Sequence, residues 1–378
     1  MKVVHFCSSY IDKWGYQENI LPKYFKEDGH DVSVIALNKF PENILDKEIS
    51  INRYYIEGIE IIRIGTYFFL SYTLFFTKGL YRTLIKQNPD ILFHHDVGLT
   101  SLLVCVCYKI FHPKCKLFVD NHADMINITK SKFWFQFYYK IILRIFSNVA
   151  SPFVEKFYGV SLGRCDFLES VFKVSKKKIK LLPIGADTLA TDKITQSKKE
   201  LKLKFKISID NLVVISGGKM GEDKGTDLLI RAVEELNGRG MKISLVLFGS
   251  FNDELTQKLA NNSKVVVVKD WCDRQSTLEL LKMADIAVWP IHHTTLIEDS
   301  ISCLTPLILR KTRTTEHLIN GNGIFIENGT VNEMKAAIVQ ITKKDSTYLT
   351  SRCNAMRDKI DYRNIVNAIV KDSSIKAR

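Results

Sequence analysis

Two lysines and several glycines near the middle of the chain could bind an anionic phosphate group. Gly217 and Gly218 precede Lys219, and Lys224 follows five residues later, next to Gly225. Glycines let a backbone approach a ligand closely, and a helix that begins after them presents free N–H groups and a positive dipole end to an anion. With two added cations, the stretch could hold a diphosphate. It matches neither the P-loop nor the dinucleotide-binding pattern, and an ordinary strand-to-helix turn with solvated lysines would look the same.

Polar residues follow two apolar runs in the first half of the chain. His122 and Asp124 come after the run 116–120, and the run 91–93 is followed by His94, His95 and Asp96. The carboxyl ends of parallel strands form the ligand-binding edge of an open α/β sheet, so these side chains could contact a ligand. A lone histidine in such a place can equally be structural, and the polar neighbours of His122 favour the functional interpretation.

A third group of polar residues lies between residues 290 and 306. It consists of His293, Thr294, Thr295, Glu298 and Asp299. The threonines and the start of a helix at Glu298 could hold phosphate oxygens. A loop with solvated histidines is the alternative. The sequence has no D-x-D, no H-E-x-x-H and no CxxC, so we expect no metal site.

Each half of the chain alternates between short apolar runs and amphipathic stretches, which is the pattern of parallel α/β sheets. In the first half we expect strands at residues 2–7, 31–37, 59–64, 91–93, 116–120 and 157–161. In the second half we expect strands at residues 212–216, 243–248, 265–268, 286–289 and 306–309. The fold class predicted is therefore α/β, with two Rossmann-like doubly wound domains whose strand ends face a cleft.

The domain boundaries follow from composition. Residues 1–187 form the first domain, and the polar, lysine-rich residues 188–204 form a linker. Residues 205–355 form the second domain, and 356–378 a C-terminal helix that could pack back on the first. The aromatic and apolar residues 66–86 are interpreted as a helix that ends before Pro89.

The net charge of +13 indicates an anionic partner. No nucleic-acid module is recognisable, so a membrane surface or a phosphorylated substrate ranks above nucleic acid. Residues 130–146 combine basic and aromatic side chains, as helices on anionic membrane surfaces do, although an amphipathic core helix is equally consistent. The scattered cysteines, the absence of a signal peptide and the lack of an apolar run of about 18–20 residues predict a cytoplasmic protein.

The chain resembles the retaining GT-B glycosyltransferases of family 4 over nearly its whole length. Four places carry the resemblance in this order: Gly15-Tyr16-Gln17-Glu18-Asn19 with Gly29-His30-Asp31-Val32; Leu182-Pro183-Ile184-Gly185-Ala186-Asp187; Gly218-Lys219 with Lys224-Gly225; and Thr294-Thr295-Leu296-Ile297-Glu298-Asp299 with Pro306. The resemblance implies an N-terminal acceptor domain and a C-terminal domain that binds a nucleotide-sugar donor. It also implies catalysis without a metal cofactor.

The resemblance implies a role for each group of residues. Lys219, where the family more often has arginine, and Lys224 would stabilise the leaving nucleoside diphosphate, beside Gly217 and Gly218. Gly15 would approach the donor phosphate. His122 would hydrogen-bond the transferred sugar. The residues assigned to the acceptor side are His94, His95, Asp96 and Asp124.

The chain departs from the family at its E-x7-E motif. Counting back from Pro306, Asp299 takes the place of the second glutamate, which would accept hydrogen bonds from the ribose, and Glu298 is the competing assignment. The first glutamate is absent, and His293, Thr294 and Thr295 occupy that region.

The function implied is transfer of a sugar, with retention, from a nucleotide sugar to a glycan or lipid-linked acceptor. A UDP-sugar is slightly favoured as donor. Bacterial surface-polysaccharide synthesis at the inner face of the plasma membrane is the setting implied. The main alternative is a non-catalytic nucleotide-sugar-binding or scaffolding protein with a degraded site. Nucleotide-sugar epimerisation and phosphorolysis are further alternatives, and phosphorolysis would require a lysine-bound cofactor for which the sequence has no signal.

Overall fold

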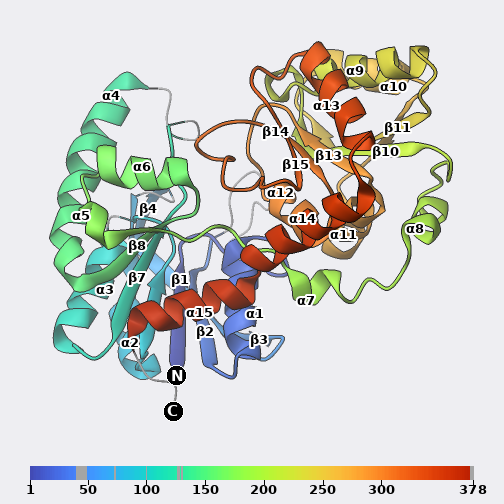
Figure 1. Cartoon of the computed structure of the whole chain (residues 1–378). Helices are drawn as coiled ribbons and strands as arrows, with labels where there is room; N and C mark the ends of the chain where they lie inside the picture. The colour runs from blue at the N-terminus through green and yellow to red at the C-terminus, as the bar shows by residue number, and fades with distance from the viewer. Residues whose placement is uncertain (40–48, 72–73, 99, 126–127, 129–130, 375–378) are drawn as a thin grey trace. The chain divides into compact units, whose positions relative to one another are not determined.

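The chain forms two compact units in a computed structural model that describes residues 1–39, 49–71, 74–98, 100–125, 128 and 131–374. Unit 1 comprises Met1–Pro183 with Tyr362–Arg378, and unit 2 comprises Ile184–Asp361 (Figure 1). Each unit is built around its own mainly parallel β-sheet. This confirms the α/β class and the two Rossmann-like halves predicted from the alternation of strands and helices. That the two sheets face a common cleft stays a prediction.

The sheet of unit 1 has the strand order β3-β4-β2-β1-β6-β7-β8-β9, with β5 paired to β4. Among the described strand pairs of this sheet, β3–β4 and β4–β5 are antiparallel and the others are parallel. The strands are β1 (Lys2–Cys7), β2 (Asp31–Leu37), β3 (Arg53–Ile56), β4 (Ile59–Ser71), β5 (Leu74–Lys78), β6 (Ile91–His94), β7 (Lys116–Asn121), β8 (Val154–Gly159) and β9 (Ile179–Leu181). Since β1, β6 and β7 are adjacent and parallel, the residues after them meet at one edge of the sheet.

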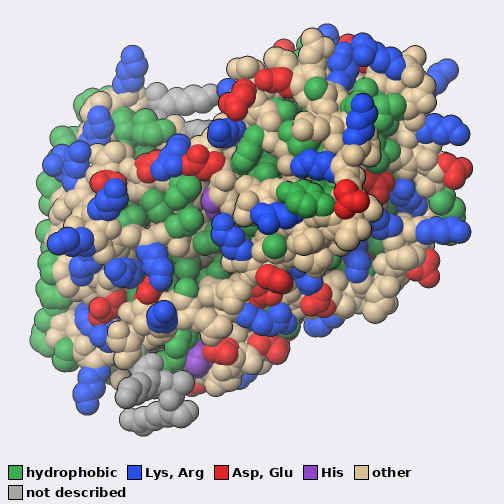
Figure 2. All heavy atoms as spheres, viewed as in Figure 1, with side chains coloured by type: hydrophobic (Ala, Val, Ile, Leu, Met, Phe, Trp, Pro, Cys, Tyr) green, Lys and Arg blue, Asp and Glu red, His purple; other side chains and the backbone are tan. Residues whose placement is uncertain are grey.

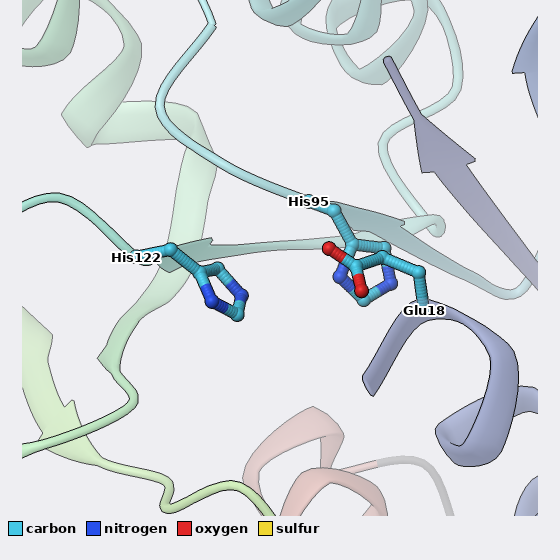
Figure 3. Close-up of side chains that lie close together, drawn as sticks. All are labelled: Glu18, His95 and His122. Carbon is cyan, nitrogen blue, oxygen red and sulfur yellow. The ribbon is translucent and has the colours of Figure 1, made fainter. Parts of the chain in front are cut away.

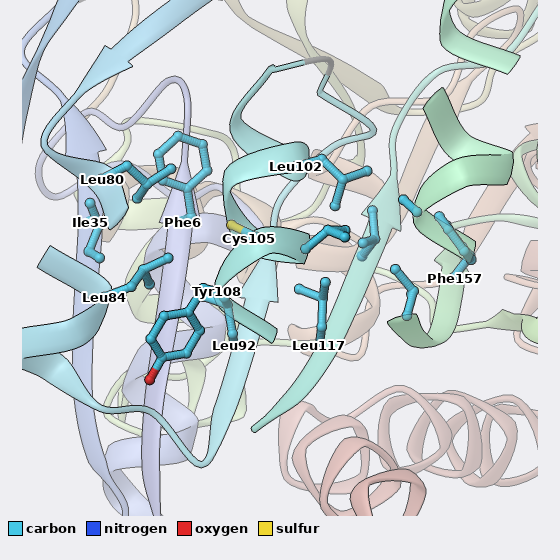
Figure 4. Close-up of a cluster of buried hydrophobic side chains, with 14 of the residues drawn as sticks. Phe6, Ile35, Leu80, Leu84, Leu92, Leu102, Cys105, Tyr108, Leu117 and Phe157 are labelled. Atoms are coloured by element: carbon cyan, nitrogen blue, oxygen red, sulfur yellow. The ribbon is translucent and has the colours of Figure 1, made fainter. Parts of the chain in front are cut away.

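Helices cover both faces of this sheet. On one face, α2 (Leu80–Gln87), α3 (Thr100–Phe111) and the π-helix η1 (Phe135–Leu143) bury an apolar core with the strands, part of which is shown in Figure 4. The short α4 (Lys132–Trp134), α5 (Arg144–Ala150) and α6 (Leu162–Ser170) complete this half of the unit. Apolar side chains on both sides of the strands explain their near-continuous hydrophobic runs.

Helix α15 (Tyr362–Ser373) brings the C-terminal part of the chain back to unit 1, beside α1 (Gln17–Glu27) (Figure 1). The rings of Tyr24 and Tyr362 lie 5.2 Å apart. The Tyr158 hydroxyl donates to Asp372 at 2.8 Å, and the Lys180 ammonium lies 2.7 Å from the same carboxylate. These contacts attach the last helix to β8 and β9.

The helix expected over residues 66–86 is wrong in its first part. The chain continues β4 to Ser71, forms β5, and only then begins α2 at Leu80. Phe68 pairs with Phe76 and Phe69 with Phe75 across the two strands, with ring centroids 6.2 and 6.3 Å apart. Aromatic side chains favour strands when a partner strand is available, and that partner cannot be recognised from apolar content alone.

Unit 2 has an entirely parallel sheet in the order β12-β11-β10-β13-β14-β15. Its strands are β10 (Leu212–Met220), β11 (Ile243–Phe251), β12 (Val266–Lys269), β13 (Ile286–Trp289), β14 (Leu307–Arg310) and β15 (Gly323–Ile326). The main helices are α9 (Thr226–Gly238), α10 (Glu254–Asn262), α11 (Arg274–Met283), α12 (Leu296–Ser302), α13 (Val331–Thr342) and α14 (Ser346–Lys359). Separate apolar clusters lie on the two faces of the sheet.

The segment interpreted as a linker contains two short helices of unit 2, α7 (Thr188–Thr191) and α8 (Lys198–Lys204). Ser197 and Glu200 form a capping box at the start of α8, and Leu201 is fully buried. Such a cap satisfies N–H groups that have no partner within the helix. The polar composition of this segment therefore reflects an exposed helix surface.

Among the residues that the structure describes, none of the helices is both long and apolar enough to cross a lipid bilayer.

Candidate functional site

An imidazole–carboxylate cluster lies at the carboxyl edge of the sheet in unit 1. We define it as His5, Glu18, His95, Asp120 and His122. Asp120, fully buried at the end of β7, accepts a hydrogen bond from Nδ1 of His95 at 2.8 Å. Nε2 of His122 lies 3.4 Å from the same carboxylate oxygen. The sheet thus brings together two of the predicted histidines and a carboxylate that lies between them.

Three members of the cluster, His5, Glu18 and Asp120, were not identified as site residues from the sequence. Nδ1 of the fully buried His5 lies 3.1 Å from Nε2 of His95, so one of the two rings donates a hydrogen bond to the other. Glu18 belongs to the first turn of α1, and its carboxylate lies within 4.8 Å of ring nitrogens of His95 and His122 (Figure 3). His5 is hidden within an apolar run, and Glu18 was only part of a motif, so spacing could not place either one.

The charges of this cluster are coupled. Burial alone would lower the pKa of His122, but the carboxylates of Asp120, Asp96 and Glu18 together outweigh burial and raise that pKa to about 9. Burial would raise the pKa of Asp120, but His95 and His122 hold it well below its usual range. The Asp120–His122 pair therefore stabilises the fold between the usual pKa of an aspartate and about pH 9. Its contribution is lost as the pH rises through the folded-state pKa of His122.

The structure separates the four residues assigned to the acceptor side. The N–H of Asp96 donates to Asp120 at 2.7 Å, and the Asp96 carboxylate accepts from the N–H of His122 at 3.1 Å, so Asp96 lies at the cluster together with His95. Asp124 pairs with Arg164 at 3.6 Å. His94 is buried toward α3, with Nε2 2.9 Å from Ser101, and burial lowers its pKa to about 4.

In unit 2, we call residues 217–225 the lysine–glycine turn. The strand before it was expected to end at residue 216 but is longer. Strand β10 continues through both glycines to Met220, followed by the 3-10 turn η4 (Glu222–Lys224) and α9. A side chain at Gly217 would lie 2.3 Å from the Phe248 ring, and Gly218 has φ +102°. Close packing and a left-handed conformation therefore explain these glycines. Lys219 is exposed, and the ammonium of Lys224 lies 3.3 Å from the Asp223 carboxylate.

The lysine–glycine turn and the 290–299 segment lie side by side within unit 2. The indole N–H of Trp289 donates to the carbonyl of Gly217 at 3.2 Å. A Cβ placed on Gly218 would lie 3.6 Å from Leu296, and one on Gly225 would lie 3.1 Å from Ile291. The residues predicted to bind the donor in the second domain therefore gather at one end of its sheet, with Thr294 and Thr295 half-buried before α12. Gly15 belongs to unit 1, in the loop before α1.

The two competing acids, Glu298 and Asp299, have different partners. Asp299 is held by both arms of the Arg274 guanidinium, at 2.5 and 2.8 Å, and Arg274 also contacts Asp187 at 3.2 Å. Burial, with the Asp187 and Glu298 carboxylates, raises the pKa of Asp299, although Arg274 acts against this shift. Arg274 was not recognised from the sequence, because nothing links it to Asp299 before the chain folds.

The two carboxylate oxygens of Glu298 differ in their contacts. Its Oε1 lies 2.7 Å from Nε2 of His293, and both side chains are buried. Its other oxygen, Oε2, is also buried and has no hydrogen-bond partner among the described residues. A buried carboxylate oxygen without a partner is costly, so a ligand hydroxyl that donated to Oε2 would be bound favourably.

Glu18, His95 and His122 include the donor types that bind divalent transition metals. Their fit to a metal is poor, because both ring nitrogens of His95 are already engaged, with Asp120 and with His5. A metal could bind His95 only if one of these buried hydrogen bonds were broken. That the activity needs no metal stays a prediction.

Comparison with known proteins gives a family match within unit 2. Residues 211–344 match the model of a family described as glycosyl transferases group 1. This range contains the lysine–glycine turn, Arg274, His293, Glu298 and Asp299. No curated protein matches the chain.

Solved structures match the chain over nearly its whole length. A glycosyltransferase from Rickettsia africae ESF-5 is 14% identical, with a TM-score of 0.69, and the match covers 98% of this chain and 97% of that one. HepE from Anabaena, in complex with UDP and glucose, is 16% identical, with a TM-score of 0.68 and 98% of each chain covered. Sucrose-phosphate synthase from Thermosynechococcus elongatus is 14% identical, with a TM-score of 0.68 and coverage of 98% and 97%. The chain therefore has the GT-B glycosyltransferase fold of two Rossmann-like units, and its residues 211–344 match the glycosyl transferases group 1 family.

Proposed function

We propose that the protein is a retaining, metal-independent glycosyltransferase of family 4 that moves a sugar from a nucleotide-sugar donor to a glycan or lipid-linked acceptor. The observation that carries this proposal is the gathering of Lys219, Lys224 and the His293–Glu298 pair at one end of the unit 2 sheet. That Anabaena HepE was solved with UDP and glucose favours a UDP-sugar as donor. The setting we propose is the synthesis of a cell-surface polysaccharide.

Each residue has a distinct part in the proposed reaction. The lysine ammonium groups stabilise the negative charge that develops on the leaving diphosphate. Gly15, His293, Thr294 and Thr295 contact the donor, and an acid at the start of α12 accepts hydrogen bonds from the ribose. His122 donates a hydrogen bond to the transferred sugar. The acceptor attacks from the face that the diphosphate leaves, and a donor phosphate oxygen takes its proton.

A nucleotide-sugar-binding protein without transferase activity is the second candidate. The observations that favour it are Ile291 at the position of the family's first glutamate and the engagement of Asp299 by Arg274. Both reduce the number of acidic groups left to hold the donor.

Product formation separates the two candidates. We expect the purified protein, given UDP-glucose or a related UDP-sugar and a membrane extract, to release UDP and to form a product with the donor's anomeric configuration. Enzyme-coupled UDP detection and NMR of the product measure the two outcomes, and activity should persist in EDTA. Tight UDP-sugar binding without UDP release would support the binding protein. Absence of any nucleotide binding would exclude both.

We further propose that unit 1 binds an anionic membrane surface, at the inner face of the plasma membrane, through α4, η1 and α5. Every fourth residue on these helices is apolar and between 45% and 75% exposed, namely Phe133, Phe137, Ile141, Ile145 and Val149. The sequence has no Asp or Glu between Asp124 and Glu155, but has Lys132, Lys140 and Arg144. Figure 2 shows hydrophobic side chains along the edge of unit 1 on which α5 lies. Exposed apolar residues flanked by cations are typical of interfacial helices.

Substitution of the apolar stripe should weaken this binding. Phe137→Asp together with Ile145→Asp removes two exposed apolar groups and adds two negative charges, so we expect at least a tenfold loss of binding to anionic vesicles. Co-sedimentation with vesicles of phosphatidylglycerol and phosphatidylcholine measures it. Leu255→Asp is the matched control, because Leu255 is 76% exposed on α10 of unit 2. Equal binding by all three proteins would contradict the proposal.

A further inference from the structure

A cavity of about 730 Å³ lies in unit 1, where the hairpin of β4 and β5 meets the start of α2. Its volume is within the range of about 300–1,000 Å³ that small-molecule sites occupy. The apolar part of its wall consists of Ile51, Ile62, Ile64, Leu80, Tyr81 and Val104. None of the candidate site residues named above is among the described residues that line it, so the cavity is a separate feature of unit 1.

The charged residues of the cavity wall are all cations. Among the described residues that line it, four are Lys or Arg and none is Asp or Glu. Arg53 is paired with Glu60 at 3.1 Å. The buried Arg63 donates to Asp12 at 2.8 Å and to the carbonyl of Tyr10 at 2.9 Å. These two charges are therefore engaged within the fold, and two cations are left for a ligand.

Lys78 and Arg82 are the two cations that are left. Both side chains are exposed, and neither forms an ion pair with a residue that the structure describes. The Lys78 ammonium lies 5.8 Å from the centroid of the Tyr67 ring. Lys78 ends β5 and Arg82 belongs to the first turn of α2, so the two flank Gly79, which precedes that helix. The start of α2 has no side-chain cap, and its backbone N–H groups add to the positive potential there.

An apolar wall beside unpaired cations fits an amphipathic anion. A purely apolar ligand would leave the two cations without a partner, and a small inorganic anion would leave the apolar wall in water. A phosphate head group suits the pair, because a phosphate ester carries a charge of about −1.5 to −2 and arginine binds phosphate oxygens bidentately. Outside the cavity, Phe68, Leu70 and Phe76 of the same hairpin are 49%, 65% and 50% exposed. A longer apolar chain could cover them.

We propose that this cavity binds a lipid phosphate, with its apolar chain against Ile62, Leu80 and Val104 and its phosphate held by Lys78 and Arg82. In the proposed transferase this lipid is the acceptor, and only that role rests on the proposed function. Binding of the lipid phosphate itself does not depend on catalysis.

Decyl phosphate, used below its micelle concentration, is the probe for the cavity. Isothermal titration calorimetry should show saturable binding to the native protein. Decyl maltoside has the same chain without the charge, and inorganic phosphate has the charge without the chain, so each should bind at least about tenfold more weakly. Lys78→Gln together with Arg82→Gln should weaken decyl phosphate binding by at least about tenfold. Binding of decyl maltoside or inorganic phosphate as tight as that of decyl phosphate would overturn the proposal.

Lys26→Gln together with Lys86→Gln is the matched control. Both lysines are exposed, one on α1 and the other in the last turn of α2, and neither is among the described residues that line the cavity. This variant loses the same charge from unit 1 and should bind decyl phosphate like the native protein. The Phe137→Asp, Ile145→Asp variant should do so too, because its substitutions lie on η1 and α5. Equal losses of binding in the cavity variant and the lysine control would contradict the proposal.

Acceptor kinetics separate this proposal from the proposed function. With a UDP-sugar and a membrane extract, the Lys78→Gln, Arg82→Gln variant should raise the KM for the acceptor by at least about tenfold and leave kcat and the KM for the UDP-sugar nearly unchanged. An unchanged acceptor KM with weaker vesicle binding would make the cavity part of the membrane-binding surface and overturn its acceptor role. Decyl phosphate binding without any turnover of a nucleotide sugar would support the cavity site and remove the transferase. Turnover without decyl phosphate binding would keep the transferase and overturn the cavity site.

Discussion

A Lys224→Ala variant should lose about half or more of the thermal stabilisation that UDP gives the native protein. At a UDP concentration 100-fold above the dissociation constant, a bound ligand stabilises the fold by about 2.7 kcal/mol. Loss of one charge-assisted contact to a phosphate costs about 1.5–3 kcal/mol of binding, or about 10- to 100-fold in affinity. The stabilisation should therefore fall to about 0.4–1.4 kcal/mol at the same concentration. Thermal denaturation followed with and without UDP measures this difference.

The site around Lys224 explains why its loss should leave the fold intact. Among the residues that the structure describes, its ammonium forms an ion pair with the neighbouring, exposed Asp223, and an exposed pair of this kind contributes little to stability. Lys258→Ala is the matched control, because Lys258 also pairs with an exposed acid, Glu254, on α10. Both variants should unfold like the native protein without UDP, and only Lys224→Ala should respond less to UDP. An undiminished response would refute the assignment of this lysine to the diphosphate.

Glu298→Gln and Asp299→Asn should affect different properties, although the two residues are adjacent. Glu298→Gln should weaken UDP binding, and Asp299→Asn should lower the stability of the fold. Asp299→Asn leaves the Arg274 guanidinium with only one carboxylate, that of Asp187, and we expect a loss of about 3 kcal/mol in the free energy of unfolding. Glu298→Gln removes the charge from the buried oxygen that has no partner among the described residues. We expect it to fold with near-native stability and to bind UDP about 10- to 100-fold more weakly.

Urea denaturation and UDP titration of both variants separate the two roles. A double-mutant cycle with Arg274→Gln should show that Asp299→Asn costs much less when the arginine is already gone, because the ion pair is then absent in both proteins. The reverse pattern, with lost UDP affinity in Asp299→Asn and none in Glu298→Gln, would return the ribose to Asp299. In that case Arg274 would have to release the carboxylate when the nucleotide binds.

Glu298 and Asp299 illustrate that contacts between distant residues cannot be predicted from a sequence motif. Counting back from Pro306 favours Asp299 as the residue that binds the ribose, because a sequence motif gives only the spacing between residues and not their contacts. The arginine that holds Asp299 lies 25 residues away, at the start of α11. The same limit applied to His5 and Glu18, which join the cluster only through the neighbouring strands β1, β6 and β7 and the first turn of α1.

The sequence by itself determined what depends on periodicity and local chemistry. Buried strands with continuous apolar runs, alternating with amphipathic helices, specify two parallel α/β units. That the glycines beside Lys219 and Lys224 bind an anion stays a prediction. The tertiary structure decided which polar residues meet. It paired residues 66–71 with 74–78 as strands, paired Asp299 with Arg274, and placed Asp120 between His95 and His122. The physical reason is that hydrogen bonds and ion pairs between distant residues depend on burial and register, which exist only once the strands lie side by side.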